Sequence, residues 1–520
     1  MSEENLRDAP APRRKLSLFQ PPAKPVAVSV LSTLRAELGG RDLPASLAYF
    51  ELVGHDRALK TTISLCPECL AYVPAIVFTK GGRVLMRKRC AEHGPSEALL
   101  ENDEKFYFLS NKDVSGRSFA PDRVFDIPPF EAPGASPCCG EGETCGPSDS
   151  ADGATPSLAT DQTANKTCTV LVEVTNACNL ACPVCYSDAK GDRKMPRADF
   201  ERYILRLIEK KGGLDSVQLT GGEAMLHPDF WQLVGFLYAE PRVKKIFLPT
   251  NGILLSRPEV AARLVPFVSK MIVLLQFDGA TDQTDTTLRG ATPARVRQDV
   301  VSQLGRLGVA MQLTMTLAAN VNAEEVGAVV EVGLKNEHVK VIALQPATYS
   351  GRYDLSQSAS ERLTLSDMVK AVARQARVSV RPSDFVPIPC SHPNCGWITL
   401  FVRRFGLVRN VVRYVDLQKV LGQVAYKTLM STDEVKSALG TAGGSLLRRA
   451  LGWSAKRLVR STDVFTVAIK PFMDRYSYDQ DRIANCCHHL MDTHGEAVSF
   501  CEYNAIGRQK DSWERLPALS

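Results

Sequence analysis

Apolar runs and amphipathic stretches alternate along residues 169–345, and this alternation constrains the fold more than any other feature. Six apolar runs have the length of strands: 169–174, 216–219, 245–248, 271–277, 310–317 and 339–344. Five amphipathic stretches with helical spacing separate them: 200–211, 230–238, 259–268, 296–307 and 323–334. Strands that alternate with helices form a parallel sheet with right-handed crossovers. About six such units are too few to close an eight-stranded barrel, so we predict an α/β fold built on a partial (β/α)6 barrel, with its site at the carboxyl ends of the strands.

A cysteine triad follows the first of these strands. Cys178, Cys182 and Cys185 have the spacing CxxxCxxC. Thiolates at this spacing can hold three irons of a 4Fe-4S cluster and leave the fourth iron open to a small molecule, which indicates catalysis rather than electron storage. A structural zinc site is the alternative, but zinc usually takes four ligands, and the nearest other cysteine, Cys168, lies beyond the apolar run. The triad therefore predicts a catalytic cluster with an open iron.

Two further motifs occur where the second and third strands end. The run LeuThrGlyGlyGlu contains Gly221 and Gly222, which let the backbone approach a ligand closely, and Glu223, which can accept from an ammonium group. The run ProThrAsnGly contains Thr250 and Asn251 at the same edge of the sheet. We predict that these five residues bind a cofactor.

Two charged residues follow later strands. Asp278 comes directly after 271–277, where an acidic residue can bind ribose hydroxyls. Arg352 follows the sixth strand and is available for a carboxylate. Each of these strand-end motifs alone fits an ordinary turn. Their occurrence in this order after the triad is a much more specific signal of a shared binding site.

In this order the motifs resemble the radical S-adenosylmethionine (SAM) superfamily over residues 169–352. The resemblance implies that SAM binds the open iron, that Glu223 accepts from its amine, and that the other strand-end residues, Asp278 included, contact adenosine or methionine. It also implies a 5'-deoxyadenosyl radical that removes a hydrogen atom from the substrate, and an electron donor such as ferredoxin or flavodoxin.

The other twelve of the fifteen cysteines also occur in clusters, beside Gly, Pro and His. This placement favours metal or iron-sulfur ligation over disulfides, and a reducing cytoplasm over an oxidising compartment. Buried structural thiols are the alternative for the last group. All twelve are candidate metal ligands: Cys66, Cys69, Cys90, Cys138, Cys139, Cys145, Cys168, Cys390, Cys395, Cys486, Cys487 and Cys501.

The first group predicts a rubredoxin-like or zinc-ribbon module. Cys66 and Cys69 form a CxxC pair, the glycines at 81–82 indicate a β-hairpin, and Cys90 and His93 follow it. We group the three cysteines with one cysteine of the following polar linker as an N-terminal metal site.

The last group predicts a C-terminal metal site. We assign to it Cys390, Cys395 and Cys501, together with either Cys486 or Cys487. The neighbouring histidines are interpreted as supporting residues rather than ligands: His392, His488 and His489.

The motifs outside the barrel resemble the tetraether lipid synthase group from about residue 61 to 504. The resemblance implies auxiliary 4Fe-4S clusters, a mononuclear iron or zinc, and carbon–carbon bond formation at unactivated carbons of a lipid or fatty-acyl chain. Methylation of a small heterocycle such as a pterin, an activity related to that group, and a non-catalytic iron-sulfur scaffold are the alternatives. The matching motifs lie at 66–69, 90–94, 350–352, 385–395, 481–489 and 500–504.

Composition divides the chain into five regions. They are a disordered extension at 1–28, a region with the CxxC module at 29–135, a cysteine-containing polar linker at 136–168, the barrel at 169–380 and a C-terminal auxiliary cluster region at 381–520.

Charge and hydropathy limit the partners. The net charge of +6 is too small to indicate nucleic acid, and no apolar run is long enough to span a bilayer. The first residues lack the apolar segment of a secretory signal, which favours the cytoplasm. Residues 446–460 contain five basic and no acidic residues, so we predict either peripheral contact with an anionic membrane or a core-packed helix.

Overall fold

The computed structural model describes residues 26–107, 167–290, 294–388, 392–412, 460–484 and 486–519. Predictions for Cys138, Cys139, Cys145 and Cys390, and for nearly all of 446–460, lie outside these ranges. Among the helices within them, none combines the length and the apolar character needed to cross a membrane.

The N-terminal region forms a four-stranded antiparallel sheet in the order β1-β2-β3-β4. The predicted hairpin is confirmed, because Lys80 pairs with Arg83 across Gly81 and Gly82, whose φ angles are 58° and 74°. Such positive φ angles suit glycine and the tight turns of β-hairpins. The strands are β1 (Arg57–Leu65), β2 (Tyr72–Lys80), β3 (Arg83–Cys90) and β4 (Gly94–Glu101).

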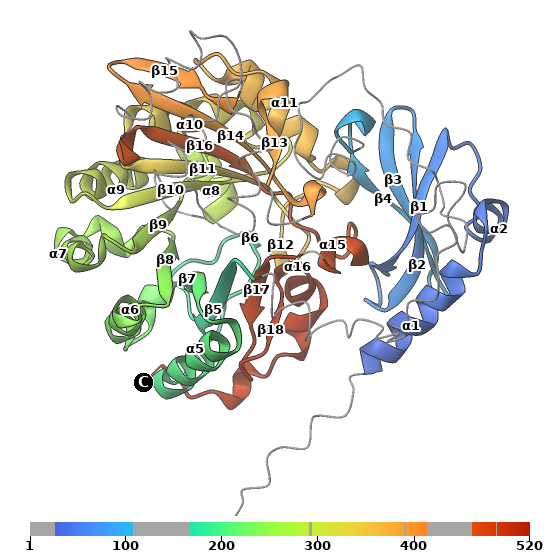
Figure 1. The fold of residues 1–520 in the computed structure, drawn as a ribbon, viewed down its shortest axis with the longest axis horizontal. Coiled ribbons are helices and arrows are strands. Elements are labelled where there is room, and N and C mark those ends of the chain that lie inside the picture. Colours follow the sequence, from blue (N-terminus) through green and yellow to red (C-terminus); the bar gives the residue numbers. More distant parts are fainter. Residues whose placement is uncertain are drawn as a thin grey trace, which may run out of the picture.

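Helices α1 (Val26–Gly39) and α2 (Leu43–Tyr49) cover one face of this sheet (Figure 1). Leu31 and Phe50 pack with Ile76 and Phe78 of β2 in one apolar cluster. Helix α1 begins at Val26, within the extension predicted at 1–28, and residues 1–25 lie outside the described ranges.

The six predicted barrel strands are confirmed, and neighbours in the sheet pair in parallel. All residues of the first strand are buried, as expected for a parallel sheet covered on both faces. The strands are β5 (Thr169–Thr175), β7 (Leu214–Gly221), β8 (Val243–Thr250), β9 (Met271–Gln276), β10 (Ala310–Leu317) and β11 (Val339–Pro346).

The helices between these strands follow the predicted pattern with two differences. The stretch 259–268 is not one helix, because Pro266 has no N–H to continue it and a short 3-10 turn replaces the second half. A helix that sequence analysis missed follows Thr281, whose side chain caps it. The helices are α5 (Arg197–Lys211), α6 (Phe230–Ala239), α7 (Pro258–Ala262), α8 (Asp282–Arg289), α9 (Ala294–Arg306), α10 (Val326–Lys335) and α11 (Leu365–Gln375).

C-terminal strands extend the same sheet at both edges, so that it has 12 strands in the described residues. β16 pairs in parallel with β11 at one edge, and β17 pairs in parallel with β5 at the other. The sheet therefore runs across the predicted boundary at residue 380, although the region division as a whole stays a prediction. The added strands are β13 (Val386–Pro387), β14 (Trp397–Arg404), β15 (Leu407–Asn410), β16 (Val464–Ile469), β17 (His488–Met491) and β18 (Ala497–Ser499).

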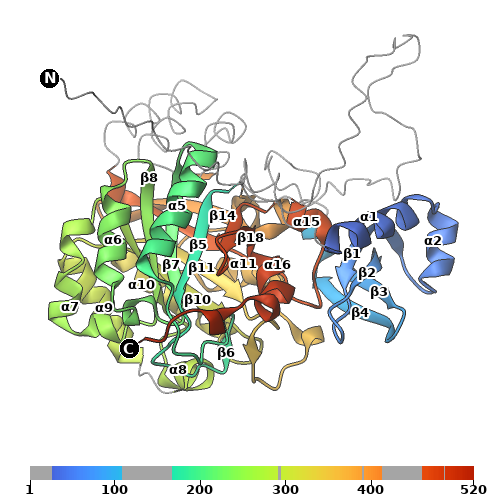
Figure 2. The same ribbon diagram turned by 90° about the horizontal axis from the view of Figure 1, so that it is seen from below.

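The C-terminal residues also lie between the two sheets. In Figures 1 and 2 the red segment with α15 (Gln480–Ala484) and α16 (Phe500–Glu502) stands between the blue N-terminal sheet and the green strands β5 and β7. A separate two-stranded ladder joins β6 (Val184–Cys185) to β12 (Arg352–Tyr353). This ladder fixes the end of the triad loop.

Candidate active site and metal sites

The triad lies on the segment that leaves β5, at the carboxyl end of the parallel strands. All three thiols are half-buried, and Leu180 donates its N–H to Sγ of Cys178 at 3.5 Å. Burial, together with the charges of Glu223 and the other two thiols, raises the pKa of Cys178 to about 11. The charges of the three thiols interact, and burial disfavours free thiolates, so the triad loop suits a bound cation such as an iron-sulfur cluster.

The two glycines of the GlyGlyGlu run pack directly against the triad loop. A Cβ on Gly221 would lie 2.0 Å from the carbonyl oxygen of Thr175, and one on Gly222 would lie 1.9 Å from that of Ala177. The backbone N–H of Gly222 donates to Thr175 at 2.9 Å. The glycines are thus needed for contact between the strand end and the triad loop.

Glu223 is 1% exposed, and its two carboxylate oxygens differ in their hydrogen bonding. Its Oε2 accepts from the Thr250 hydroxyl and the Asn251 N–H, both at 3.0 Å. Its Oε1 is buried and accepts no hydrogen bond from the part of the chain that the structure describes. Burial raises the pKa of Glu223 to about 7. A buried acceptor of this kind fits a nitrogen donor such as the SAM amine.

Thr250 and Asn251 lie where the sequence predicts, at the end of β8 beside Glu223. The Asn251 side-chain amide also donates to Oδ1 of Asn179 at 2.7 Å, and Asn179 is the residue after Cys178. This hydrogen bond joins the third strand end to the triad loop.

The geometry around Asp278 gives no support to the predicted contact with a ribose. It is fully buried, and its oxygens accept from Arg289 at 2.6 and 2.9 Å, from the Thr316 N–H at 2.8 Å and from Gln276. Burial opposes its ionisation, but the Arg289 charge outweighs that effect and the pKa of Asp278 is lowered. The carboxylate is paired because the next helix supplies an arginine.

Arg289 itself is a site residue that sequence analysis missed. Its Nη1 donates to the Val184 carbonyl at 3.2 Å, and its guanidinium hydrogen-bonds to the Cys182 thiol. Asp278 therefore orients an arginine that holds the triad loop. The only sequence signal was an arginine before the Gly290 that ends α8.

Arg352 lies beside the triad loop but is already paired. In the β6–β12 ladder it stands opposite Cys185, and its Nε donates to Oδ1 of Asp188 at 2.9 Å. The carboxylate that Arg352 binds is thus one from this chain. The predicted contact with a cofactor carboxylate finds no support in this geometry.

The N-terminal module brings four metal-binding side chains together. Ligand atoms of Cys66, Cys69, Cys90 and His93 all lie within 4.8 Å of one another. Nδ1 of His93 is 3.6 Å from Sγ of Cys90 and 3.8 Å from Sγ of Cys66. His93 therefore takes the place that we predicted for a linker cysteine. Three thiols and an imidazole are an ordinary ligand set for structural zinc.

The C-terminal cysteines separate into two groups. Burial raises the pKa of Cys486 to about 11 and also raises that of Cys501, and the Cys395 charge adds to both shifts. Cys487 instead packs against Cys168 in a different buried cluster. Of the two alternatives, Cys486 is therefore the one whose charge interacts with Cys395 and Cys501.

The neighbouring histidines have hydrogen-bond partners, and Nδ1 of His488 also lies 3.3 Å from Sγ of Cys487, so the supporting role stays a prediction. Nδ1 of His392 accepts from the Asn394 N–H at 3.1 Å, Nδ1 of His489 lies 3.0 Å from the Thr167 hydroxyl, and Nε2 of His488 lies 2.9 Å from Nζ of Lys470.

Fold and site together define an enzyme that uses a SAM-binding iron-sulfur cluster, and comparison with known families agrees. Residues 172–332 match the model of the radical SAM superfamily, and residues 58–102 match that of the HMPTM N-terminal zinc ribbon domain. The barrel of this chain is a radical SAM domain. Its cofactors are a 4Fe-4S cluster and SAM, and its zinc-ribbon region carries an auxiliary metal site.

Individual relatives include 7,8-dihydro-6-hydroxymethylpterin dimethyltransferase of Methanocaldococcus jannaschii, which is 26% identical over 88% of this chain and 97% of that protein. GTP 3',8-cyclase of Chlorobaculum tepidum is 28% identical over 34% of this chain and 53% of that protein. The crystal structure of Streptococcus suis SuiB bound to its precursor peptide SuiA has a TM-score of 0.34 and 17% identity over 40% of this chain and 45% of that chain. The resemblance to tetraether lipid synthases finds no support among these relatives.

Proposed function

We propose that the protein is a radical SAM methyltransferase whose substrate is a small fused heterocycle of the pterin class. The observation that carries this proposal is the similarity to the pterin dimethyltransferase, which extends over 88% of this chain and 97% of that protein and so reaches well beyond the barrel. A match to the barrel alone would support the radical chemistry and leave the substrate open.

The residues of the site have distinct roles in this proposal. The triad thiolates hold three irons, and the spare Oε1 of Glu223 accepts from the SAM amine. Asn251 and Arg289 hold the triad loop in place from two sides, which keeps the reacting groups in a fixed geometry. When bound, the cluster and SAM supply a 5'-deoxyadenosyl radical and a methyl group. An electron donor such as ferredoxin or flavodoxin supplies the reducing electron.

Transfer of a labelled methyl group tests the proposal. Protein reconstituted anaerobically with iron and sulfide is incubated with reductant, 6-hydroxymethyl-7,8-dihydropterin and SAM labelled in its methyl group. We expect the label in the pterin and expect deoxyadenosine to form. The Cys182→Ala variant, which lacks one cluster ligand, is expected to form neither product. Deoxyadenosine without labelled pterin would contradict the proposed substrate.

Carbon–carbon coupling of lipid or fatty-acyl chains is the second candidate, favoured by the cysteine motifs outside the barrel. Those motifs include Cys395, Cys486 and Cys501, whose charges interact. Coupling would produce deoxyadenosine and a cross-linked lipid without methyl transfer. Lipid extraction and mass spectrometry after anaerobic expression therefore distinguish the two candidates. Peripheral membrane contact belongs to this second candidate alone.

A further inference from the structure

One face of the N-terminal sheet holds a C-terminal segment through side chains that alternate along β1. Lys60 donates to Asp479 at 2.9 Å and to Asp481 at 2.8 Å. Thr62 donates to the other oxygen of Asp479 at 2.8 Å, and Ser64 donates to the Tyr478 carbonyl at 2.6 Å. Residues two apart on a strand point to the same face of the sheet, so these three side chains form one polar row on that face. We call residues 471–482 the docking segment.

A buried lysine joins the docking segment to the zinc-ribbon ligands. Lys88 of β3 is 1% exposed, and its Nζ donates to the carbonyls of Leu65 and Arg475, both at 2.9 Å. Leu65 directly precedes Cys66, and Lys88 lies two residues before Cys90. A buried ammonium is tolerated only when hydrogen-bonded, so its position depends on both carbonyls.

The opposite side of the docking segment contacts the auxiliary cysteines. The Met473 N–H donates to Sγ of Cys501 at 3.4 Å, and the Arg482 guanidinium hydrogen-bonds to Cys395. Nη2 of Arg482 also donates to the carbonyls of Asn394 and Pro471, at 3.0 and 3.1 Å. The same short segment thus contacts the zinc ribbon on one side and two candidate cluster ligands on the other.

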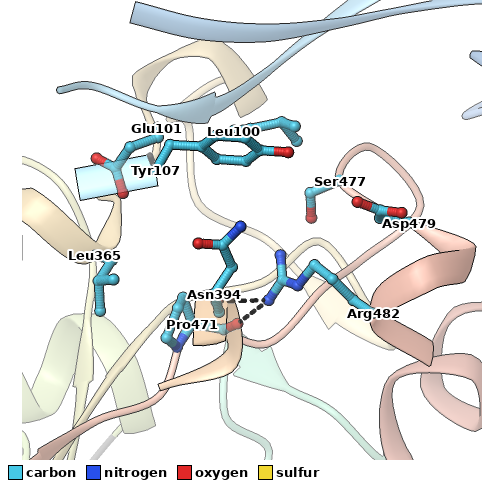
Figure 3. A pocket seen from close by; sticks show the side chains of 9 residues that line it. All are labelled: Leu100, Glu101, Tyr107, Leu365, Asn394, Pro471, Ser477, Asp479 and Arg482. Atoms are coloured by element: carbon cyan, nitrogen blue, oxygen red, sulfur yellow. Dashed lines mark hydrogen bonds between the residues drawn. The ribbon is translucent and has the colours of Figure 1, made fainter. Parts of the chain in front are cut away.

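A small polar pocket shows how loosely this junction is packed. Figure 3 shows Glu101 and Tyr107 of the ribbon region facing Asn394 and Arg482 across it, with Leu365 of α11 at one side. Its volume of ≈ 30 Å³ suits about one or two waters. Polar contacts therefore supplement the apolar packing of Met473 and Tyr478 against Leu65 and Tyr72 in holding the docking segment.

We propose that the zinc ribbon positions the auxiliary cysteine site. With its four ligands engaged, the ribbon presents Lys60, Thr62 and Ser64 to the docking segment, which in turn holds Met473 and Arg482 against Cys501 and Cys395. These ribbon residues are positioning residues, because they act on the cysteines through the docking segment. The proposal goes beyond the methyltransferase function and does not depend on the substrate.

Hydrogen exchange on the full-length, metal-loaded protein tests the proposal. In the Lys60→Met, Thr62→Val double variant we expect amide exchange in residues 473–482 to rise about tenfold, which corresponds to ~1.4 kcal/mol of local opening. Exchange in β8 and β9 is expected to stay unchanged. The matched control is Lys80→Met, which removes an exposed lysine from the hairpin end of the same sheet.

Two further measurements decide the outcome. The Cys69→Ser variant removes one zinc ligand, and it is expected to raise exchange in the same residues and to change the electron paramagnetic resonance signal of the auxiliary cluster but not that of the triad cluster. Unchanged exchange in residues 473–482 in both variants, with zinc lost from Cys69→Ser, would overturn the proposal. A change of equal size in the triad signal would also overturn it.

Discussion

At the scale of single residues, Glu223 is the most informative side chain in the site. It is buried beside the triad, two donors of this chain use one of its oxygens, and the other oxygen lacks a donor from the described residues. A buried carboxylate oxygen without a partner is costly, which indicates that a ligand supplies the missing hydrogen.

We expect Glu223→Gln to weaken SAM binding by about tenfold or more, because a hydrogen bond to a charged group contributes ~1.5–3 kcal/mol. Isothermal titration of SAM into the reconstituted protein measures the change. The matched control is Glu259→Gln on exposed α7, which is expected to bind SAM like the wild type. If the wild type and both variants bind SAM with equal affinity, Oε1 of Glu223 does not accept a hydrogen bond from SAM.

Glu101 gives the protein a predictable pH dependence. It is 4% exposed and accepts from Thr364 and Ser366, and burial raises its pKa from the ordinary 4.5 to about 7. Between these values the folded protein keeps a proton that the unfolded chain loses. The free energy of unfolding therefore falls as the pH rises through this window and levels off above about pH 7.

Replacing Glu101 by Gln is expected to remove this contribution, on the order of 2 kcal/mol between about pH 5 and about pH 8. Denaturant titrations of the wild type and the variant at both pH values measure the difference. The Glu259→Gln protein serves as the control and is expected to keep the wild-type slope. Glu223 contributes a slope of its own in this window, so a slope in Glu101→Gln equal to that of the wild type would assign the effect to other groups.

At the scale of secondary-structure elements, contact between strand ends and the triad loop shapes the site. The β7 end approaches so closely that Gly222 has no room for a side chain, whereas Gly235 in α6 has no heavy atom within 4 Å of an added Cβ. These two glycines make a matched pair for the same substitution.

We expect Gly222→Ala to lower the iron bound by the triad and to destabilise the fold by about 1–3 kcal/mol, because the Ala177 backbone would have to move. Gly235→Ala is expected to keep the iron and to be neutral or stabilising by about 0.5–1 kcal/mol, since it lies within a helix. Iron analysis and thermal unfolding of both variants check this. Full iron content in Gly222→Ala would mean that the loop tolerates displacement.

The elements also show which parts of the molecule were predictable. The six strands and the triad followed from local sequence patterns, because buried parallel strands read as apolar runs and cluster ligands have fixed spacing. The roles of His93 and Asp278 depended on tertiary contacts. His93 reaches the metal site only because two hairpin turns meet, and Asp278 is taken up by an arginine from the following helix. Such contacts leave no signal in the spacing of one segment.

At the scale of the whole molecule, the sheet depends on strands that lie far apart in the chain. Residues after 380 provide β16 beside β11 and β17 beside β5, so both edges of the parallel core are covered by C-terminal strands. An uncovered strand edge is prone to pair with other chains.

A chain that ends at residue 380 is therefore expected to aggregate, because β5 and β11 lose their partners. A chain that starts at residue 167 keeps every strand of the large sheet and is expected to remain soluble. Size-exclusion chromatography compares the aggregation of the two truncated proteins, and circular dichroism compares their folding. A monomeric, folded 1–380 protein would show that the parallel core is stable without these strands.

The covered edges also set an order of events during synthesis. The strands of the parallel core leave the ribosome well before residues 464–491, which contain β16 and β17. Domains begin to fold as they emerge from the ribosome. The edge strands of the parallel core therefore stay unpaired until the C-terminal strands have been synthesised. During this interval β5 and β11 lack their edge partners and are most exposed to pairing with other chains.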